Sequence, residues 1–318
     1  MADQHEAEGG MLGQMPGTGP TAEAIEPRIV VPLDGSEGAL TALPVARGLA
    51  QVTGATIHLL HVSEQALPLR EVSRQLGLTP EQMEGVVLDE LTGEPAERIA
   101  QFCCEPGTLL VMASRSNHGK YGLGEVSSRV LELAGCPIVL VRRERGMAPW
   151  CLQRMLLPHD GSPVTAAGFR PAVRLAQLAE ATVFVLHVAT LSGEPTPGSL
   201  PVPPYVDQPH LEWPEWSLEF LERMDVFTET AAALQPRLFL SKGDPGQEIL
   251  RFARERGVDL IAVSWHGTLE LRRAGTLKEI IDNAPCPVFF AKAPEEEPAE
   301  TQHRGTIDLR NAGPFLHS

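Results

Sequence analysis

Short apolar runs alternate with segments of helical periodicity along most of the chain. The runs IVVPL, TIHLLHV, GVVLDEL, TLLVMAS and IVLVR are bounded by Gly, Pro or polar residues, which is typical of buried strands. Between the runs, apolar residues recur every three or four positions, as in the segment after Ser36, whose side chain favours a helix N-terminus. This alternation predicts a parallel sheet with helices on its faces.

The same order of elements occurs twice. RIVVPLDGS from Arg28 returns as RMLLPHDGS from Arg154, and LLHV returns as VLHV at the same offset. GEPAERI returns as GDPGQEI and GCPIVLV as APCPVFF at a larger offset, so an insertion lies between His187 and Gly243. Matching blocks in one order indicate a duplicated domain. We expect a flexible tail at 1–26, a first copy at 27–145, a second copy at 152–294 and a flexible tail at 295–318.

The insertion is rich in Pro and ends near Trp213 and Trp216. The two tryptophans could form a lid or a patch for a partner, but tryptophans at helical spacing more often pack on their own domain. The sequence leaves both interpretations open.

Charge and cysteine content narrow the class of protein. The formal net charge is -15, which argues against sequence-independent nucleic-acid binding and against an anionic membrane surface. No apolar run reaches the ~20 residues of a membrane-spanning helix. The five cysteines show no zinc-site spacing. We therefore expect a cytoplasmic protein with reduced thiols and neither nucleic acid nor membrane as partner.

Asp34 and Asp160 each follow the first strand of a copy. Open α/β sheets bind ligands outside the carboxyl ends of their strands, where a carboxylate can accept hydrogen bonds from amino or hydroxyl groups. The dipeptide Asp-Gly also strongly favours a turn, so a purely structural role for these aspartates stays open. His61 and His187 close the second strands, and we expect each to bond backbone rather than a ligand.

The loop after each fourth strand contains Ser-x-His-Gly and ends at a Gly that precedes a helix. Glycine allows close backbone approach to a phosphate, and a helix N-terminus offers free N–H groups. In the second copy Gly275 is followed by Thr276, which adds a hydroxyl donor. In the first copy Gly124 is followed by Glu125, whose charge would repel a phosphate.

Taken together, these blocks resemble the universal stress protein family in its tandem two-domain form. The resemblance runs from about Arg28 to Lys292. It implies an α/β fold of two tandem Rossmann-like domains, each a five-stranded parallel sheet of order 3-2-1-4-5 flanked by helices. Some members of the family bind ATP and others do not. Both glycine loops here are shorter than in the nucleotide-binding members, the first-copy loop more so, which favours the second copy as the nucleotide site.

By resemblance, an adenine nucleotide would contact the first-strand carboxylate, the backbone at the end of the second strand and the glycine loop. His266 could contact phosphate or only stabilise its own turn. The expected second-copy contacts are Asp160, Val188, His266, Gly267, Gly275 and Thr276, and the weaker first-copy candidates are Asp34, Val62, Gly119 and Gly124.

The leading functional hypothesis is therefore a regulatory stress-response module that binds ATP or a related adenine nucleotide. The alternative is an interaction scaffold of the same fold without nucleotide. An enzyme is not expected, because the chain shows no Walker loop, Ser/His/Asp framework or metal cluster. The fifth strands, Ile138–Arg142 and Val288–Lys292, are apolar edges. We expect them to pair as an intramolecular pseudo-dimer; a homodimer and an unknown protein partner stay open.

Overall fold

The structure is a computed structural model that describes residues 26–114, 123–161, 163–189, 234, 236–265 and 274–292. Both expected tails lie almost wholly outside these ranges. So do the insertion with Trp213 and Trp216 and three loop candidates, Gly119, His266 and Gly267.

The first copy forms a parallel half-sheet with the strand order β3-β2-β1-β4-β5. The central strand β1 pairs with β2 on one side and β4 on the other, so the strand order reverses beside it. This is the order 3-2-1-4-5 that the family resemblance implies. The strands are β1 (Arg28–Pro32), β2 (Thr56–Ser63), β3 (Val86–Thr92), β4 (Thr108–Ser114) and β5 (Ile138–Arg142).

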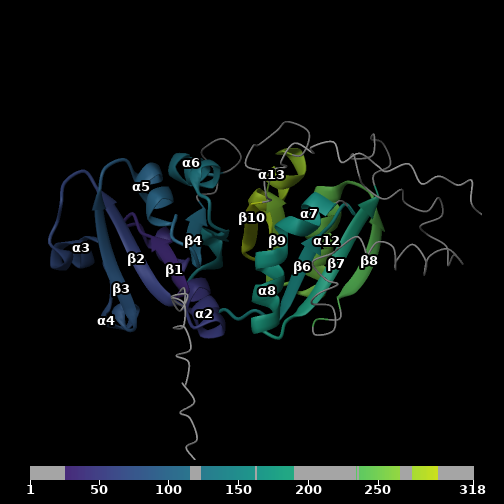
Figure 1. Cartoon of the computed structure of the whole chain (residues 1–318), viewed down its shortest axis with the longest axis horizontal. Helices are drawn as coiled ribbons and strands as arrows, with labels where there is room; N and C mark the ends of the chain where they lie inside the picture. Colours follow the sequence, from purple (N-terminus) through teal and green to yellow (C-terminus); the bar gives the residue numbers. More distant parts are fainter. Residues whose placement is uncertain are drawn as a thin grey trace, which may run out of the picture.

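The second copy repeats this half-sheet, with β6 as its central strand between β7 and β9 (Figure 1). Its pairs are again parallel, and β8 forms its outer edge. The strands are β6 (Arg154–Pro158), β7 (Thr182–Ala189), β8 (Arg237–Lys242), β9 (Leu260–Trp265) and β10 (Val288–Lys292).

The two half-sheets are continuous. Strand β5 pairs antiparallel with β10, with Val288 opposite Leu140 and Phe290 opposite Ile138. The result is one ten-stranded sheet made of two five-stranded halves. The edges join because each fifth strand presents unpaired N–H and C=O groups that the other satisfies.

Helices cover both faces of the sheet. One expected helix in each copy is broken in two: α1 ends at Leu40 and α2 begins at Leu43, and α7 is followed by α8 in the same way. The cause is a proline near the start of the second helix, Pro44 in the first copy and Pro171 in the second. Proline lacks an N–H and clashes with the carbonyl four residues earlier. The helices are α1 (Glu37–Leu40), α2 (Leu43–Thr53), α3 (Leu69–Gln75), α4 (Pro80–Met83), α5 (Pro95–Phe102), α6 (Glu125–Leu133), α7 (Pro163–Gly168), α8 (Arg170–Leu178), α12 (Pro245–Arg256) and α13 (Ala274–Asn283), with a 3-10 turn η2 (Arg143–Arg145).

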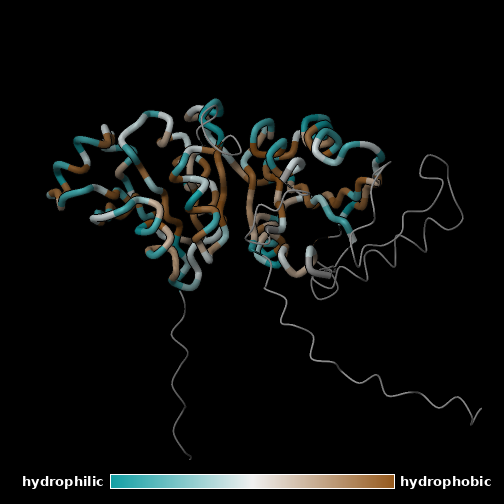
Figure 2. Tube along the Cα trace, turned by 90° about the horizontal axis from the view of Figure 1, so that it is seen from above, coloured by the Kyte–Doolittle hydropathy of each residue, from teal (hydrophilic) through white to brown (hydrophobic). Residues whose placement is uncertain are grey.

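Two apolar cores lie on opposite faces of the sheet, and each runs through both copies. The core under α2 and α8 includes Val139 and Phe289, and the core under α5, α6, α12 and α13 includes Ile138 and Phe290. Figure 2 shows hydrophobic residues concentrated along the inner strands. Alternate residues of the paired fifth strands therefore extend each core across the junction.

The linker between the copies is fixed to both of them. Trp150 lies against Gly48 of α2, where an added Cβ would come 2.8 Å from the ring atom Cε3. The indole N–H of Trp150 donates to the backbone carbonyl of Asp259 at 3.2 Å in the second copy. Arg142, at the end of β5, donates to the carbonyl of Ala284 at 3.4 Å. These contacts help to hold the two copies in the relative position that the pairing of β5 with β10 sets.

Candidate functional site

A cavity of about 360 Å³ opens at the carboxyl ends of β1, β2 and β4 in the first copy. Its apolar wall comes from these strands and from α5, and its polar groups come from Asp34, Glu125, Ser127 and Arg143. The volume lies within the range of small-molecule sites. The cavity sits where strand order reverses around β1, the expected ligand position in an open α/β sheet.

Three of the weaker sequence candidates line this cavity together. Asp34 follows β1, Val62 lies near the end of β2, and Gly124 is the N-cap of α6. They come from separate elements, and the parallel sheet brings them to the same edge. The fourth first-copy candidate, Gly119, lies outside the described residues.

Asp34 takes part in the turn that follows β1. Its Oδ1 accepts hydrogen bonds from the N–H of Ser36 at 3.0 Å and from the Ser36 hydroxyl. Ser36 then caps α1 by accepting from the N–H of Ala39 at 3.3 Å. Gly35 supplies the positive φ, 80°, that the turn needs. The structural role that the sequence left open is thus present, alongside the position of Asp34 in the cavity wall.

Arg143, which also lines the cavity, contacts the same carboxylate. Its Nη2 lies 3.7 Å from Oδ2 of Asp34. The guanidinium passes over Gly38, where an added Cβ would come 2.5 Å from Nη1, so the contact depends on a glycine there. Sequence reasoning missed Arg143. Its one signal was its place directly after the fifth strand, at the sheet edge that carries the site.

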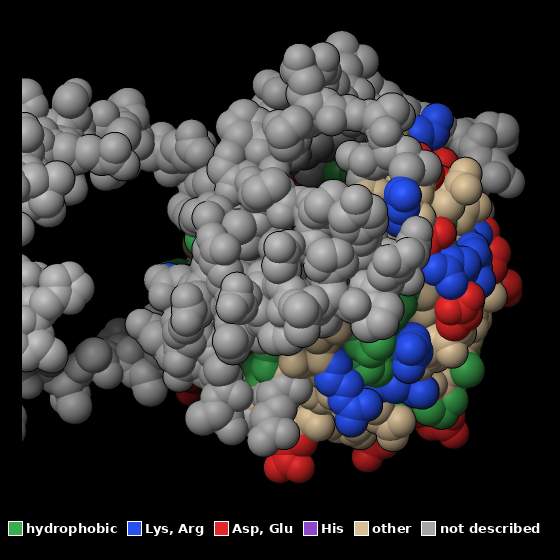
Figure 3. Space-filling model, turned by 90° about the vertical axis from the view of Figure 1, so that its right-hand side faces the viewer, with side chains coloured by type: hydrophobic (Ala, Val, Ile, Leu, Met, Phe, Trp, Pro, Cys, Tyr) green, Lys and Arg blue, Asp and Glu red, His purple; other side chains and the backbone are tan. Residues whose placement is uncertain are grey.

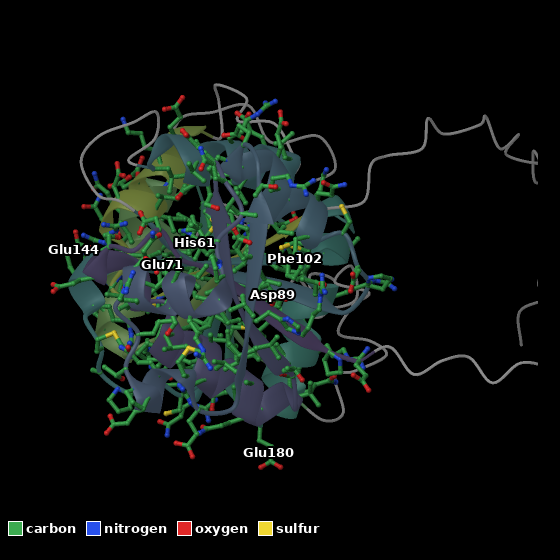
Figure 4. The ribbon with its side chains drawn as sticks, turned by 90° about the vertical axis from the view of Figure 1, so that its left-hand side faces the viewer. His61, Glu71, Asp89, Phe102, Glu144 and Glu180 are labelled. Carbon is green, nitrogen blue, oxygen red and sulfur yellow. The ribbon has the colours of Figure 1, made fainter. Side chains whose placement is uncertain are left out.

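The histidines at the ends of the second strands bond backbone, as predicted. Nδ1 of His61 donates to the carbonyl of Leu33 at 3.0 Å, and Nδ1 of His187 donates to the carbonyl of His159 at 2.9 Å. Figure 4 views the first copy from its β3 edge, with His61 labelled inside the fold. Each histidine thereby fixes the backbone just before the first-strand aspartate.

The second copy differs at the residue before that aspartate. The first copy has Leu33 there, and the second has His159, which is buried. Nδ1 of His159 accepts from the N–H of Gly161 at 2.7 Å, and burial lowers the pKa of His159 to about 4. Burial also lowers the pKa of His187. Both imidazoles are therefore neutral near pH 7, and neither places a positive charge beside Asp160.

The remaining second-copy candidates lie on elements that correspond to those of the first-copy cavity. Asp160 follows β6, Val188 is in β7, and Gly275 and Thr276 are in the first turn of α13. In the first copy, α6 begins instead with Glu125 and has no side-chain cap. The first turn of α13 therefore carries a hydroxyl, from Thr276, where the first turn of α6 carries the carboxylate of Glu125.

The described outer surface of the second copy mixes both signs of charge (Figure 3). On α12, Arg251 pairs with Glu248 and with Glu255, the latter at 3.0 Å. Arg256 lies over the ring of Phe239, 4.8 Å from its centroid. Arg251 and Arg256 on this helix are thus both in contact with neighbouring side chains.

Within the described ranges, no helix is both long and apolar enough to cross a membrane. The same residues contain no group of three or more His, Cys, Asp or Glu side chains placed to hold a metal ion. Their cysteines are all free thiols.

The fold and the cavity define a class: a tandem α/β protein with a cavity at the carboxyl ends of the strands of its first copy. The sequence model of the universal stress protein family matches residues 27–82 and 152–292. The chain belongs to the universal stress protein family, with one family segment in each copy.

Individual relatives agree with this assignment. Universal stress protein YxiE of Bacillus subtilis is 30% identical over 148 residues, which cover 44% of this chain and 98% of the relative. Universal stress protein MJ0531 of Methanocaldococcus jannaschii is 28% identical over 151 residues, 46% of this chain and 85% of the relative. The crystal structure of a universal stress protein from Archaeoglobus fulgidus DSM 4304 matches with a TM-score of 0.59 and 19% identity, over 83% of this chain and 98% of that one. At this identity the last match shows the fold alone.

Proposed function

We propose that this chain is a regulatory, non-enzymatic module of the cytoplasm that binds ATP or a related adenine nucleotide, mainly in its second copy. One observation carries the proposal. Asp34, Val62 and Gly124 gather around a cavity of ligand size, and the second copy repeats their elements with Asp160, Val188 and Gly275.

The contrast between the helix starts supports the preference for the second copy. Thr276 lies in the first turn of α13, so backbone N–H groups and a hydroxyl are available to a phosphate. Glu125 lies in the first turn of α6, and its charge opposes a phosphate there. Asp160 would accept hydrogen bonds from the ribose hydroxyls, the role that acidic residues have in dinucleotide-binding folds.

The first copy supports the alternative of an interaction scaffold. Arg143 pairs with Asp34, and Glu125 borders the same cavity. A nucleotide entering this copy would have to compete with Arg143 for Asp34 and bring its phosphates close to a carboxylate. We therefore propose that the second copy binds the nucleotide and that the first copy has a structural or regulatory role.

The junction of β5 and β10 is also part of the proposal. We propose that it persists in solution as an intramolecular pseudo-dimer, because it covers two strand edges within one chain. The edges that a homodimer would use are then already occupied.

Native mass spectrometry of gently purified full-length protein tests the function. We expect one adenine nucleotide for each chain, either retained from the cell or bound on addition of ATP. We also expect no ATP hydrolysis above the buffer background in the same preparation. Protein that stays free of nucleotide at saturating ATP would favour the scaffold, and sustained hydrolysis would overturn the non-enzymatic role.

A further inference from the structure

Arg143 lines the first-copy cavity with hydrogen-bonding capacity to spare. Its Nη2 lies 3.7 Å from Oδ2 of Asp34, a longer separation than the ~2.7–2.9 Å of a charge-assisted hydrogen bond. Within the part of the chain that the structure describes, Nε of Arg143 is buried and has no hydrogen-bond partner. A guanidinium carries five N–H donors in a planar fork that matches a carboxylate. The cavity wall therefore contains a cation that can bind the carboxylate of a ligand.

Two carboxylates line the same cavity. Asp34 follows β1 and Glu125 begins α6, so they reach the cavity from different elements. The neighbouring Glu144, which is labelled in Figure 4, lies 3.4 Å from Arg142 instead. The described lining thus has one positively charged side chain, Arg143, and two negatively charged ones. This excess of negative charge favours a ligand that carries an ammonium group as well as a carboxylate.

Most of the remaining wall is apolar. Four of the lining residues are also buried members of the core under α5, α6, α12 and α13, namely Leu60, Ile99, Met112 and Val130. Their side chains offer hydrocarbon and thioether surface only, so the part of a ligand that lies against them gains most if it is apolar. The volume of about 360 Å³ is near the lower end of the ~300–1,000 Å³ of small-molecule sites. The cavity therefore suits a small ligand with a charged head and an apolar body.

The second copy lacks both residues that create the position of this guanidinium. Arg143 passes over Gly38, where an added Cβ would come 2.5 Å from Nη1. At the offset that relates the first strands, the sequence has Val164 in place of Gly38. At the offset that relates the fifth strands, it has Ala293 in place of Arg143. The glycine and the arginine thus occur together in the first copy and are both replaced in the second, so this charged wall is particular to the first copy.

We propose that the first-copy cavity binds a free α-amino acid with an apolar side chain. The α-carboxylate binds the guanidinium of Arg143, the α-ammonium group binds the carboxylates of Asp34 and Glu125, and the side chain packs against the apolar wall. An amino acid carries both charges on one carbon atom. Arg143 and Asp34 hold opposite charges 3.7 Å apart, so a single head group reaches both. The inference does not rest on nucleotide binding in the second copy.

Simpler ligands match only part of this wall. An apolar carboxylate engages Arg143 but adds a negative charge beside Asp34 and Glu125. An apolar amine engages the two carboxylates but leaves the buried Nε–H of Arg143 without an acceptor, which costs free energy. A phosphate brings still more negative charge to the two carboxylates. The zwitterionic head of an amino acid avoids all three penalties.

Isothermal titration calorimetry on the full chain, without nucleotide, tests the ligand class. The probes are L-leucine, L-methionine and L-phenylalanine, and we expect at least one of them to bind with one site for each chain. Three analogues then test each part of the contact. The N-acetyl derivative of the bound amino acid removes the ammonium charge, its methyl ester removes the carboxylate, and L-serine keeps the head group without the apolar body. Each should bind about tenfold more weakly or less.

Neighbouring arginines provide matched variants that place the site. Arg143→Ala gives the first copy the residue type that the second copy has at Ala293, and it should weaken binding by about tenfold or more. Arg142→Ala removes a neighbouring charge that does not line the described cavity, and it should bind as the parent does. Thermal melts check that both variants are folded.

Three outcomes would overturn the proposal. The first is no heat of binding with any of the three amino acids at millimolar concentration. The second is an N-acetyl derivative, a methyl ester or L-serine that binds as tightly as the apolar amino acid. The third is an equal loss of affinity in Arg143→Ala and Arg142→Ala. Because these titrations contain no nucleotide, their result is separate from that of an ATP titration of the second copy.

Discussion

Phe289 of β10 lies directly opposite Val139 of β5, and both side chains are almost fully buried. The two residues belong to the same apolar core, which passes from one copy into the other at this point. The junction is therefore a packed interior as well as a pair of hydrogen-bonded edges, and the copies should unfold as coupled units.

A double-mutant cycle on this pair tests the coupling. Phe289→Ala should lower the free energy of unfolding by about 3–5 kcal/mol, and Val139→Ala by a smaller amount, because each leaves a cavity in the core. Since the two side chains face each other, the double variant should lose less than the sum of the single losses. Urea denaturation measures all three variants. Strictly additive losses would show that the copies do not pack together here.

Two helical glycines give a matched pair for the contacts around the linker. At Gly48 an added methyl would meet the backbone carbonyl and ring of Trp150, whereas at Gly38 the nearest atoms belong to the movable side chain of Arg143. Gly48→Ala should therefore destabilise the fold by about 1–3 kcal/mol, the usual cost of overpacking. Gly38→Ala should stay within about 1 kcal/mol of the parent, because Arg143 can turn away and alanine favours the helix. Equal effects in thermal or urea melts would contradict the assigned contacts.

The buried histidine of the second copy predicts a pH dependence. The pKa of His159 falls from 6.5 to about 4 in the fold, so between these values the unfolded chain binds a proton that the folded chain does not. Its contribution to stability is complete above pH 6.5 and is lost as pH falls towards 4, by up to about 1.4 kcal/mol for each pH unit. His187, whose pKa is also lowered, acts in the same direction.

His159→Leu tests this dependence, because Leu33 occupies the corresponding position in the first copy. We expect the loss of stability between pH 6.5 and 4 to become shallower in this variant, as followed by urea denaturation across the pH series. A slope identical to that of the parent would show that His159 is not the group responsible.

The strands could be predicted from the repeated apolar runs, and their order from the family resemblance. The bounds of β5 and β10, Ile138–Arg142 and Val288–Lys292, agree with the predicted fifth strands. The position of Asp34 at the cavity edge also follows from its place after β1, because the ends of parallel strands meet at one edge.

Other features depend on contacts that no local pattern records. Arg143 reaches Asp34 only because the chain turns back after β5 and passes over Gly38. The break between α1 and α2 did have a sequence signal, Pro44, but apolar periodicity continues across it and predicts one helix.

Isothermal titration calorimetry with ATP tests the central claim, nucleotide binding in the second copy, most directly. The parent should show one site. Asp160→Ala, and Thr276→Glu, which installs the first-copy residue type, should each weaken binding by about tenfold or more, the loss of a charge-assisted hydrogen bond or the gain of a repulsive charge. Asp34→Ala should leave the affinity unchanged. Equal losses for Asp34→Ala and Asp160→Ala, or no heat of binding in the parent, would contradict the assignment.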